Sequence, residues 1–240
     1  MSSSSAASSL PSLPEIPLSE ARKDRFSKCY SLFTSQISKS DGWVEESSPC
    51  DGVTMQSIAV EGMSLRRFKS VGVISAPASE VSKLLWEPEA RMTWDKSYLG
   101  ITNLNRIIGG EPTDDIVTQR LLIKGILVIS QRDFVCTHMR RTLPGGEAIT
   151  VSYAVPEDEN VYPIDPNFTR GEVCDGTGWR VRPIKEKNAA SGKEEEHCEL
   201  TYVIMTDLKG WVPAWVINGA MGQTFKAYYE GLRSKLNSTS

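Results

Sequence analysis

Two segments of the chain carry hydrophobic residues at helical spacing. Near the start, apolar residues recur at intervals of four, three and four, at Phe26, Tyr30, Phe33 and Ile37. Ser19 precedes this run as a candidate helix N-cap, and the pattern ends near residue 40. A longer amphipathic pattern predicts a helix over residues 213–236, with apolar positions at Ile217, Met221, Phe225, Tyr228, Leu232 and Leu236.

Most of the chain between these two helices has the pattern of β-strands. Turn signals such as Gly109-Gly110 and Gly145-Gly146 separate the strands, while Pro77 begins a short helix and Pro88 begins another turn. The predicted strands cover residues 53–60, 64–74, 98–108, 116–123, 133–140, 148–155, 172–183 and 199–207. Because strands mostly follow strands, the order predicts an α+β fold with an antiparallel sheet and segregated helices.

Composition and charge narrow the class of protein. Residues 1–19 are mostly Ser, Pro and Ala, which predicts a disordered tail before one domain over residues 20–240. The tail lacks a basic and apolar signal segment, and no apolar run reaches the roughly 18 residues that cross a bilayer. We therefore expect a cytoplasmic protein. A formal net charge of −3 disfavours nucleic-acid binding.

Catalytic and metal-binding patterns are not found in the sequence. It contains no nucleophile elbow, no phosphate-binding loop and no paired histidines of a zinc protease. His138 and His197 are its only two histidines and lie far apart, and its five cysteines lack C-x-x-C spacing. We therefore expect a protein that is not an enzyme and that holds neither a metal nor a cofactor.

Two apolar features remain after these exclusions. Residues 121–129 form the most apolar stretch, interrupted by Lys124-Gly125, which favours either a buried strand or a loop with an apolar tip at the rim of a cavity. Trp211 and Trp215 flank the start of the last predicted helix. Tryptophan is favoured at membrane interfaces, although both residues are equally compatible with an ordinary core.

Several motifs resemble the START family, the steroidogenic-acute-regulatory-protein-related lipid transfer domain. They are Ile129-Ser130-Gln131-Arg132-Asp133-Phe134-Val135, Leu200-Thr201-Tyr202-Val203, and Asp207-Leu208-Lys209-Gly210-Trp211-Val212-Pro213 followed by Ile217-Asn218. Trp94-Asp95 and the segment 80–86 also fit the family pattern, so the resemblance runs from about residue 20 to the end. It implies a helix-grip fold, in which a curved antiparallel sheet surrounds a long C-terminal helix, with a cavity for one lipid and usually no catalysis.

The resemblance also assigns polar residues to the expected cavity. Gln119 stands where ceramide- and sterol-binding relatives place a polar or acidic residue, and His138 stands where sterol-binding relatives have an arginine. Ser152 and Phe225 stand where a ceramide-binding relative has an amide and a tyrosine. We therefore expect a cavity without a fixed charge, suited to a hydroxyl or amide headgroup. The expected apolar lining comprises Val117, Leu121, Val203, Met205, Ile217 and Met221.

Lipid exchange requires a closed cavity to open at the membrane. We expect Gly125, Ile126, Leu127, Val128 and Ile129 in one loop, together with Trp211 and Trp215, to form the membrane contact and gate. The predicted function is a monomeric lipid-transfer protein that binds a single sterol, phospholipid or ceramide and touches membranes transiently. Two alternatives remain open: a helix-grip cyclase or hydrolase that uses His138, and a lipid-sensing regulatory module.

Overall fold

The computed structural model describes residues 13–125, 129–155, 162–187 and 194–238. Its elements follow one another in the order β1 (Glu15–Pro17), α1 (Glu20–Ser38), β2 (Val44–Glu46), β3 (Val53–Ala59), β4 (Arg66–Ile74), α2 (Ala78–Trp86), α3 (Pro88–Met92), β5 (Tyr98–Ile108), β6 (Asp114–Ile123), β7 (Arg132–Thr142), β8 (Ala148–Ala154), β9 (Thr169–Arg170), β10 (Glu172–Val173), β11 (Thr177–Lys187), β12 (Glu194–Ile204), β13 (Thr206–Asp207) and α4 (Ala214–Asn237).

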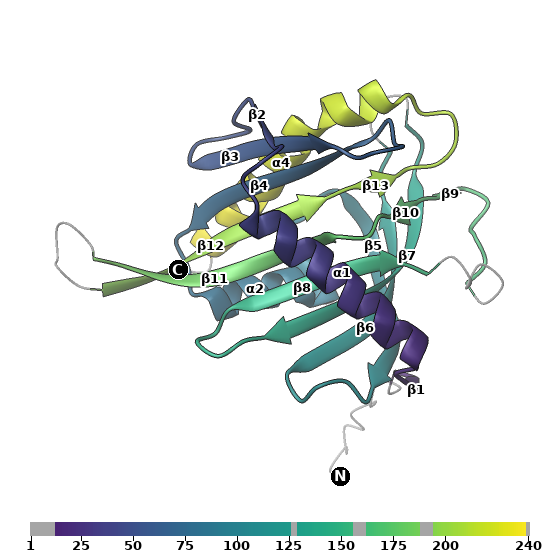
Figure 1. Cartoon of the computed structure of the whole chain (residues 1–240), viewed down its shortest axis with the longest axis horizontal. Coiled ribbons are helices and arrows are strands. Elements are labelled where there is room, and N and C mark those ends of the chain that lie inside the picture. Colours follow the sequence, from purple (N-terminus) through teal and green to yellow (C-terminus); the bar gives the residue numbers. More distant parts are fainter. Residues whose placement is uncertain (1–12, 126–128, 156–161, 188–193, 239–240) are drawn as a thin grey trace, which may run out of the picture.

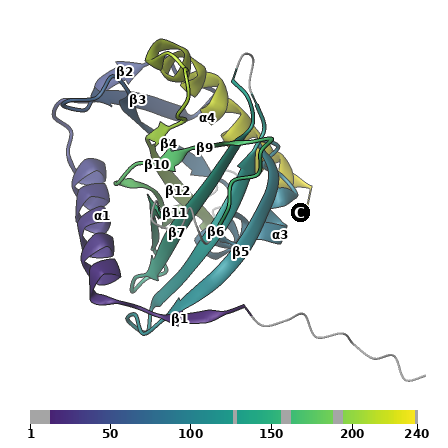
Figure 2. The same cartoon turned by 90° about the vertical axis from the view of Figure 1, so that its right-hand side faces the viewer.

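One large curved sheet organises the domain (Figure 1). Its 11 strands run in the order β1-β5-β6-β7-β8-β11-β12-β4-β3-β2, with β9 beside β7. The short strand β1 pairs in parallel with β5, and the short strand β9 pairs in parallel with β7, while the other neighbours are antiparallel. Figures 1 and 2 place α1 on one face, called here the outer face, and α4 on the opposite, inner face. The predicted α+β helix-grip fold is confirmed.

The outer face is covered by α1. Ser19 caps this helix by accepting a hydrogen bond at Oγ from the backbone N–H of Arg22, over 3.4 Å. Phe26 and Phe33 lie buried against the sheet, and the Phe26 ring packs edge-on against Tyr153 at a centroid distance of 5.1 Å. The predicted spacing of apolar residues in this segment therefore marks the face of α1 that contacts the sheet.

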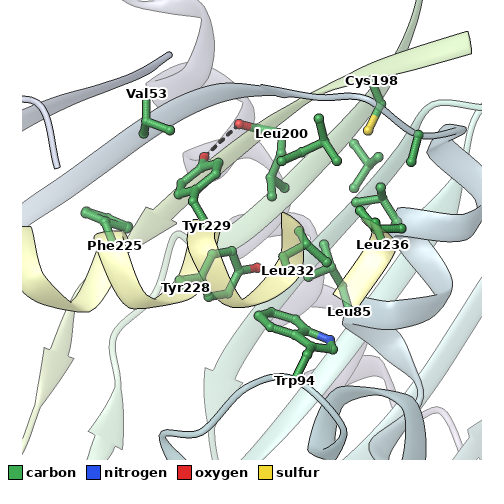
Figure 3. Close-up of a cluster of buried hydrophobic side chains, with 14 of the residues drawn as sticks. Val53, Leu85, Trp94, Cys198, Leu200, Phe225, Tyr228, Tyr229, Leu232 and Leu236 are labelled. Carbon is green, nitrogen blue, oxygen red and sulfur yellow. Dashed lines mark hydrogen bonds between the residues drawn. The ribbon is translucent and has the colours of Figure 1, made fainter. Parts of the chain in front are cut away.

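The inner face buries the C-terminal half of α4 (Figure 3). Phe225, Tyr229 and Leu232 are completely buried there. The Tyr229 hydroxyl donates a hydrogen bond to the backbone carbonyl of Leu200, over 3.0 Å, and so satisfies its polar atom inside the core. Since Lys226 is the first charged residue of α4, the N-terminal half of the helix carries no charge.

The structure differs from the sequence predictions at three places. The expected tail is wrong at Glu15–Pro17, which forms β1 because its backbone pairs with the edge of β5; residues 1–12 lie outside the described residues. The strand expected at 172–183 is broken by a turn at Gly176, whose positive φ of 82° ends β10 before β11 begins. The exposed edge strand β2 was not predicted, since three residues carry little periodicity.

No helix among the described residues is long and apolar enough to cross a membrane.

Candidate functional site

An internal cavity of about 80 Å³ lies between the inner face of the sheet and the helices α2 and α3. Its walls are mainly apolar and aromatic, with a few polar side chains converging among them. The lining residues are Leu85, Trp86, Pro88, Arg91, Tyr98, Ile101, Gln119, Leu121, Ile123, Phe134, His138, Ser152, Val173, Thr177, Trp179, Tyr202, Ile204 and Thr206. An apolar chamber with few polar groups is the usual form of a small-molecule site.

His138 is the most informative polar residue in this wall. It comes from β7 opposite Ser152 of β8, and its Nδ1 lies 2.7 Å from the Ser152 hydroxyl oxygen. Burial, together with the positive charge of Arg91, lowers the pKa of His138 to about 4. The imidazole is therefore neutral near pH 7, and its buried Nε2 has no hydrogen-bond partner in the structure. A ligand with a hydroxyl or amide group would satisfy that nitrogen.

Arg91 of α3 brings a fixed charge to the cavity wall. Its guanidinium makes an ion pair of 2.8 Å with Asp95, and both side chains are less than a tenth exposed. The guanidinium also lies over the rings of Trp94, Tyr228 and Trp179, at 4.8, 5.0 and 5.8 Å from their centroids. The expectation of a cavity without a fixed charge is therefore wrong, although Asp95 balances the charge.

Sequence reasoning missed Arg91 because it treated the segment after Pro88 as a short turn. A signal was present: Arg91 and Asp95 are four residues apart, the spacing at which opposite charges meet on a helix. Burial disfavours the charge on Arg91, but its tyrosine neighbours and Asp95 raise its pKa, so it stays protonated. The sequence alone gave no reason to expect this pair inside the protein.

The fold brings some of the expected ligand contacts together at the cavity, namely Gln119, Leu121, His138 and Ser152. They come from three adjacent strands, β6, β7 and β8, with their side chains on the inner face. Gln119 donates a hydrogen bond from Nε2 to Oδ1 of Asn103, over 2.8 Å, so its amide is already partly satisfied. This leaves His138 as the lining side chain of this group with a buried unpartnered polar atom.

The other expected contacts lie elsewhere. Val203 and Met205 alternate with the cavity-lining Tyr202, Ile204 and Thr206 along the chain, and Val203 packs in the cluster beneath α1 on the outer face. Val117 is buried in β6 but is not among the lining residues.

The expected contacts on α4 are also separated from the cavity. Met221 and Phe225 pack in the core of the inner face, where the ring of Phe225 lies 5.8 Å from that of Tyr202, itself part of the cavity wall. Ile217 lines a separate surface hollow of about 260 Å³ between the start of α4 and the β3–β4 turn. Tyr202 therefore stands between α4 and the cavity.

The residues expected at the gate differ sharply in exposure. The side chains of Trp211 and Trp215 are 94% and 76% exposed, whereas Ile129 is buried at 8%. Gly125 is exposed, and Ile126, Leu127 and Val128 lie outside the described residues. Met63 of the β3–β4 turn, which is 44% exposed, lines the same hollow as Ile217 and was missed because nothing in the sequence links that turn to α4.

The comparisons with known proteins agree with this geometry. The START domain family model matches residues 26–239. The sheep mitochondrial steroidogenic acute regulatory protein is 26% identical over 205 residues, covering 82% of this chain and 65% of that relative. The human StAR-related lipid transfer protein 6 is 26% identical over 175 residues, covering 70% of this chain and 73% of the relative. The chain thus spans about two thirds of the length of the sheep protein.

Solved structures show the same fold. Human StAR-related lipid transfer protein 5 superposes with a TM-score of 0.74 at 17% identity, covering 91% of this chain and 99% of the other. Human StarD13 superposes with a TM-score of 0.62 at 23% identity, covering 85% of this chain and 94% of the other. With the family model spanning nearly the whole described domain, the chain belongs to the START domain family.

Proposed function

We propose that this chain binds one lipid in the internal cavity and exchanges it with membranes. The observation that carries the proposal is the cavity itself, which is apolar except for a few groups and includes the unpartnered Nε2 of His138. The names of the relatives, which describe steroidogenic regulation and lipid transfer, support the same function. An apolar chamber replaces the bilayer around the acyl chain or sterol ring of the lipid, while one polar contact selects its headgroup.

The cavity has to expand to hold such a ligand. Its volume of about 80 Å³ is well below the roughly 300–1,000 Å³ of typical small-molecule sites. Tyr202, Phe225 and Tyr228 form an aromatic layer on the α4 side, with ring centroids 5.0 to 5.8 Å apart around Tyr202. We infer that lipid uptake moves this layer and α4 away from the sheet.

The charges around the cavity favour a lipid with an uncharged headgroup. Arg91 is already paired with Asp95, and His138 is neutral near pH 7. A phosphate would therefore enter the cavity without a free cation to balance it, at a high desolvation cost. A hydroxyl or amide, as in a sterol or a ceramide, would instead pair with His138 Nε2 at no such cost.

The membrane contact is proposed at the start of α4. Trp211, Trp215 and Met63 present exposed apolar side chains there, and residues 210–225 contain no charge. Tryptophan stabilises binding at the interface because its ring is apolar and its N–H finds a polar partner. We propose that a monomeric cytoplasmic protein docks transiently through this surface.

Native mass spectrometry of the protein purified from cells tests the proposed cargo. A single intact lipid with an uncharged headgroup is expected, and the His138→Ala variant should retain less of it. A phosphate-bearing lipid as the main cargo would contradict the proposed headgroup. Conversion of a bound compound that stops in His138→Ala would instead identify an enzyme.

Vesicle-to-vesicle transfer tests the proposed membrane contact. The double variant Trp211→Ala and Trp215→Ala should slow transfer by about tenfold while lipid binding persists. Ile108→Ala is a matched control, because Ile108 is also an exposed apolar residue, at 46%, but lies at the end of β5 beside β1. Transfer at the wild-type rate by the double variant would exclude this surface. Lipid binding without any transfer by the wild-type protein would indicate a sensor.

A further inference from the structure

Arg132, at the start of β7, holds two separate segments of the chain together. Its Nε donates to the backbone carbonyl of Leu208 over 2.6 Å, and one terminal nitrogen donates to the carbonyl of Lys209 over 3.4 Å. The other terminal nitrogen donates to both the carbonyl and the hydroxyl oxygen of Ser130, each over 2.7 Å. One guanidinium therefore links the segment before α4 to the segment before β7.

The acceptors around Arg132 are unusual for a buried cation. Arg132 is only 4% exposed, and among the described ranges its side chain makes no ion pair with a carboxylate. Its guanidinium donates to uncharged oxygens of Ser130, Gln131, Leu208 and Lys209. A buried cation is normally neutralised by a carboxylate, whereas backbone carbonyls stabilise it only while the two segments stay in place.

The segment held by Arg132 lies over one end of the cavity. Leu208 packs against a cluster that includes Leu121, Phe134 and Val173. These three residues also line the cavity. Movement of Leu208 away from the cluster would therefore uncover the apolar end of the chamber. The same segment continues directly into Trp211 and the uncharged first turns of α4.

A second set of contacts on this segment is exposed to solvent. The Lys209 ammonium pairs with Glu172 at 2.9 Å and with Asp207 at 3.0 Å, but these side chains are 34% to 43% exposed. Exposed ion pairs contribute little to stability because water and salt screen them. The buried hydrogen bonds of Arg132 are therefore the stronger restraint on Leu208.

We propose that Arg132 is a positioning residue for lipid exchange, whose hydrogen bonds to Leu208 and Lys209 hold the segment before α4 closed over the cavity. The proposal rests on the proposed function, because it assumes that a lipid passes this end of the chamber. Opening breaks the bonds to Leu208 and Lys209, while those to Ser130 remain within β7's own segment. The frequency of opening, and with it the rate of exchange, then depends on this guanidinium.

The proposed role of Arg132 predicts that the rate of lipid exchange changes while the affinity for lipid does not. Weakening the bonds of Arg132 makes the open state more frequent whether or not the cavity is occupied. Uptake and release therefore accelerate together, and the equilibrium affinity for lipid changes little. A residue that only supported the cavity wall would instead reduce affinity together with stability.

Amide hydrogen exchange tests whether Arg132 holds the segment before α4, and it needs no lipid. In Arg132→Gln, amides of residues 208–216 should exchange at least about tenfold faster than in the wild-type protein, while those of β8 and β11 stay unchanged. Arg132→Lys keeps the charge but loses the forked donors, so it should show an intermediate effect and serves if the Gln variant does not fold. Lys209→Gln is the matched control on the same segment and should have a small effect.

Lipid release tests the consequence for function. The probes are dehydroergosterol and NBD-labelled ceramide, with cyclodextrin as the acceptor. Release from Arg132→Gln or Arg132→Lys should be several-fold to about tenfold faster than from the wild type, at an affinity within about twofold. Unchanged amide exchange at 208–216 in both variants, or affinity that falls as release accelerates, would overturn the role of Arg132. Failure of the wild-type protein to bind either probe would count against the proposed cargo. The hydrogen-exchange result would still decide whether Arg132 holds the segment before α4 closed.

Discussion

The buried neutral state of His138 makes the stability of the protein depend on pH in a defined window. Burial and Arg91 lower the pKa of this imidazole to about 4, from an ordinary value of 6.5. Between these two pH values the unfolded chain binds the proton and the folded chain does not. The free energy of unfolding therefore falls as pH decreases from 6.5 towards 4, and the full contribution is present above pH 6.5.

The size of this effect follows from the two pKa values. The shift of His138 from 6.5 to about 4 corresponds to about 3 kcal/mol over the whole window. Between pH 7.5 and pH 5, the contribution of His138 to the free energy of unfolding falls by about 2 kcal/mol, because most but not all of the window between the two pKa values has been crossed. Replacing His138 with Gln removes the titrating group while keeping a polar side chain of similar length.

Urea unfolding of the wild type and His138→Gln at pH 7.5 and pH 5 measures this contribution. Other groups titrate in both proteins, so the relevant quantity is the difference between their two pH dependences. The wild type should lose about 2 kcal/mol more than the variant between these pH values. Near-ultraviolet circular dichroism checks that the variant retains its packing. Equal pH dependences in two folded proteins would refute a buried neutral imidazole at this position.

Three further substitutions test the packing of individual side chains and glycines. Phe33→Ala should destabilise the domain by about 3–5 kcal/mol, because its completely buried ring packs between α1 and the sheet. Lipid occupancy, measured by native mass spectrometry, should persist because this side chain lies on the outer face. Loss of lipid from a variant that denaturation shows to be folded would contradict the assignment of faces. Gly178→Ala places a Cβ 2.2 Å from the Thr150 carbonyl oxygen and should strongly destabilise the protein. Gly219→Ala in α4 meets nothing within 4 Å and should raise the melting temperature, because alanine favours a helix over glycine. Equal melting temperatures of the two variants would contradict these packing assignments.

Local pattern was sufficient to place most elements along the chain. The strand expected at 98–108 has the bounds of β5, and the helix expected at 213–236 differs from α4 by one residue at each end. The motifs of the START family were also present in the sequence and are confirmed by the family model over 26–239. Spacing and motifs are properties of neighbouring residues, so they can be recognised without knowledge of the fold.

The side of the sheet on which each strand residue lies could not be obtained in the same way. In β8 every residue is buried, and in β7 the first eight are, because α1 covers the outer face and the cavity and helices cover the inner face. A strand buried on both faces lacks the polar alternation that would reveal its orientation. Val203 was therefore expected in the cavity, although its neighbours Tyr202 and Ile204 line it.

The chemistry of the cavity depends on contacts between segments distant in sequence. His138 and Ser152 meet because β7 pairs with β8, and Arg91 approaches them because α3 packs over the inner face. The chain carries the side chains and the local preference for each helix and strand. Their mutual distances, the burial that lowers the pKa of His138, and the hold of Arg132 on Leu208 arise only when these elements pack together, because each is an interaction across the fold.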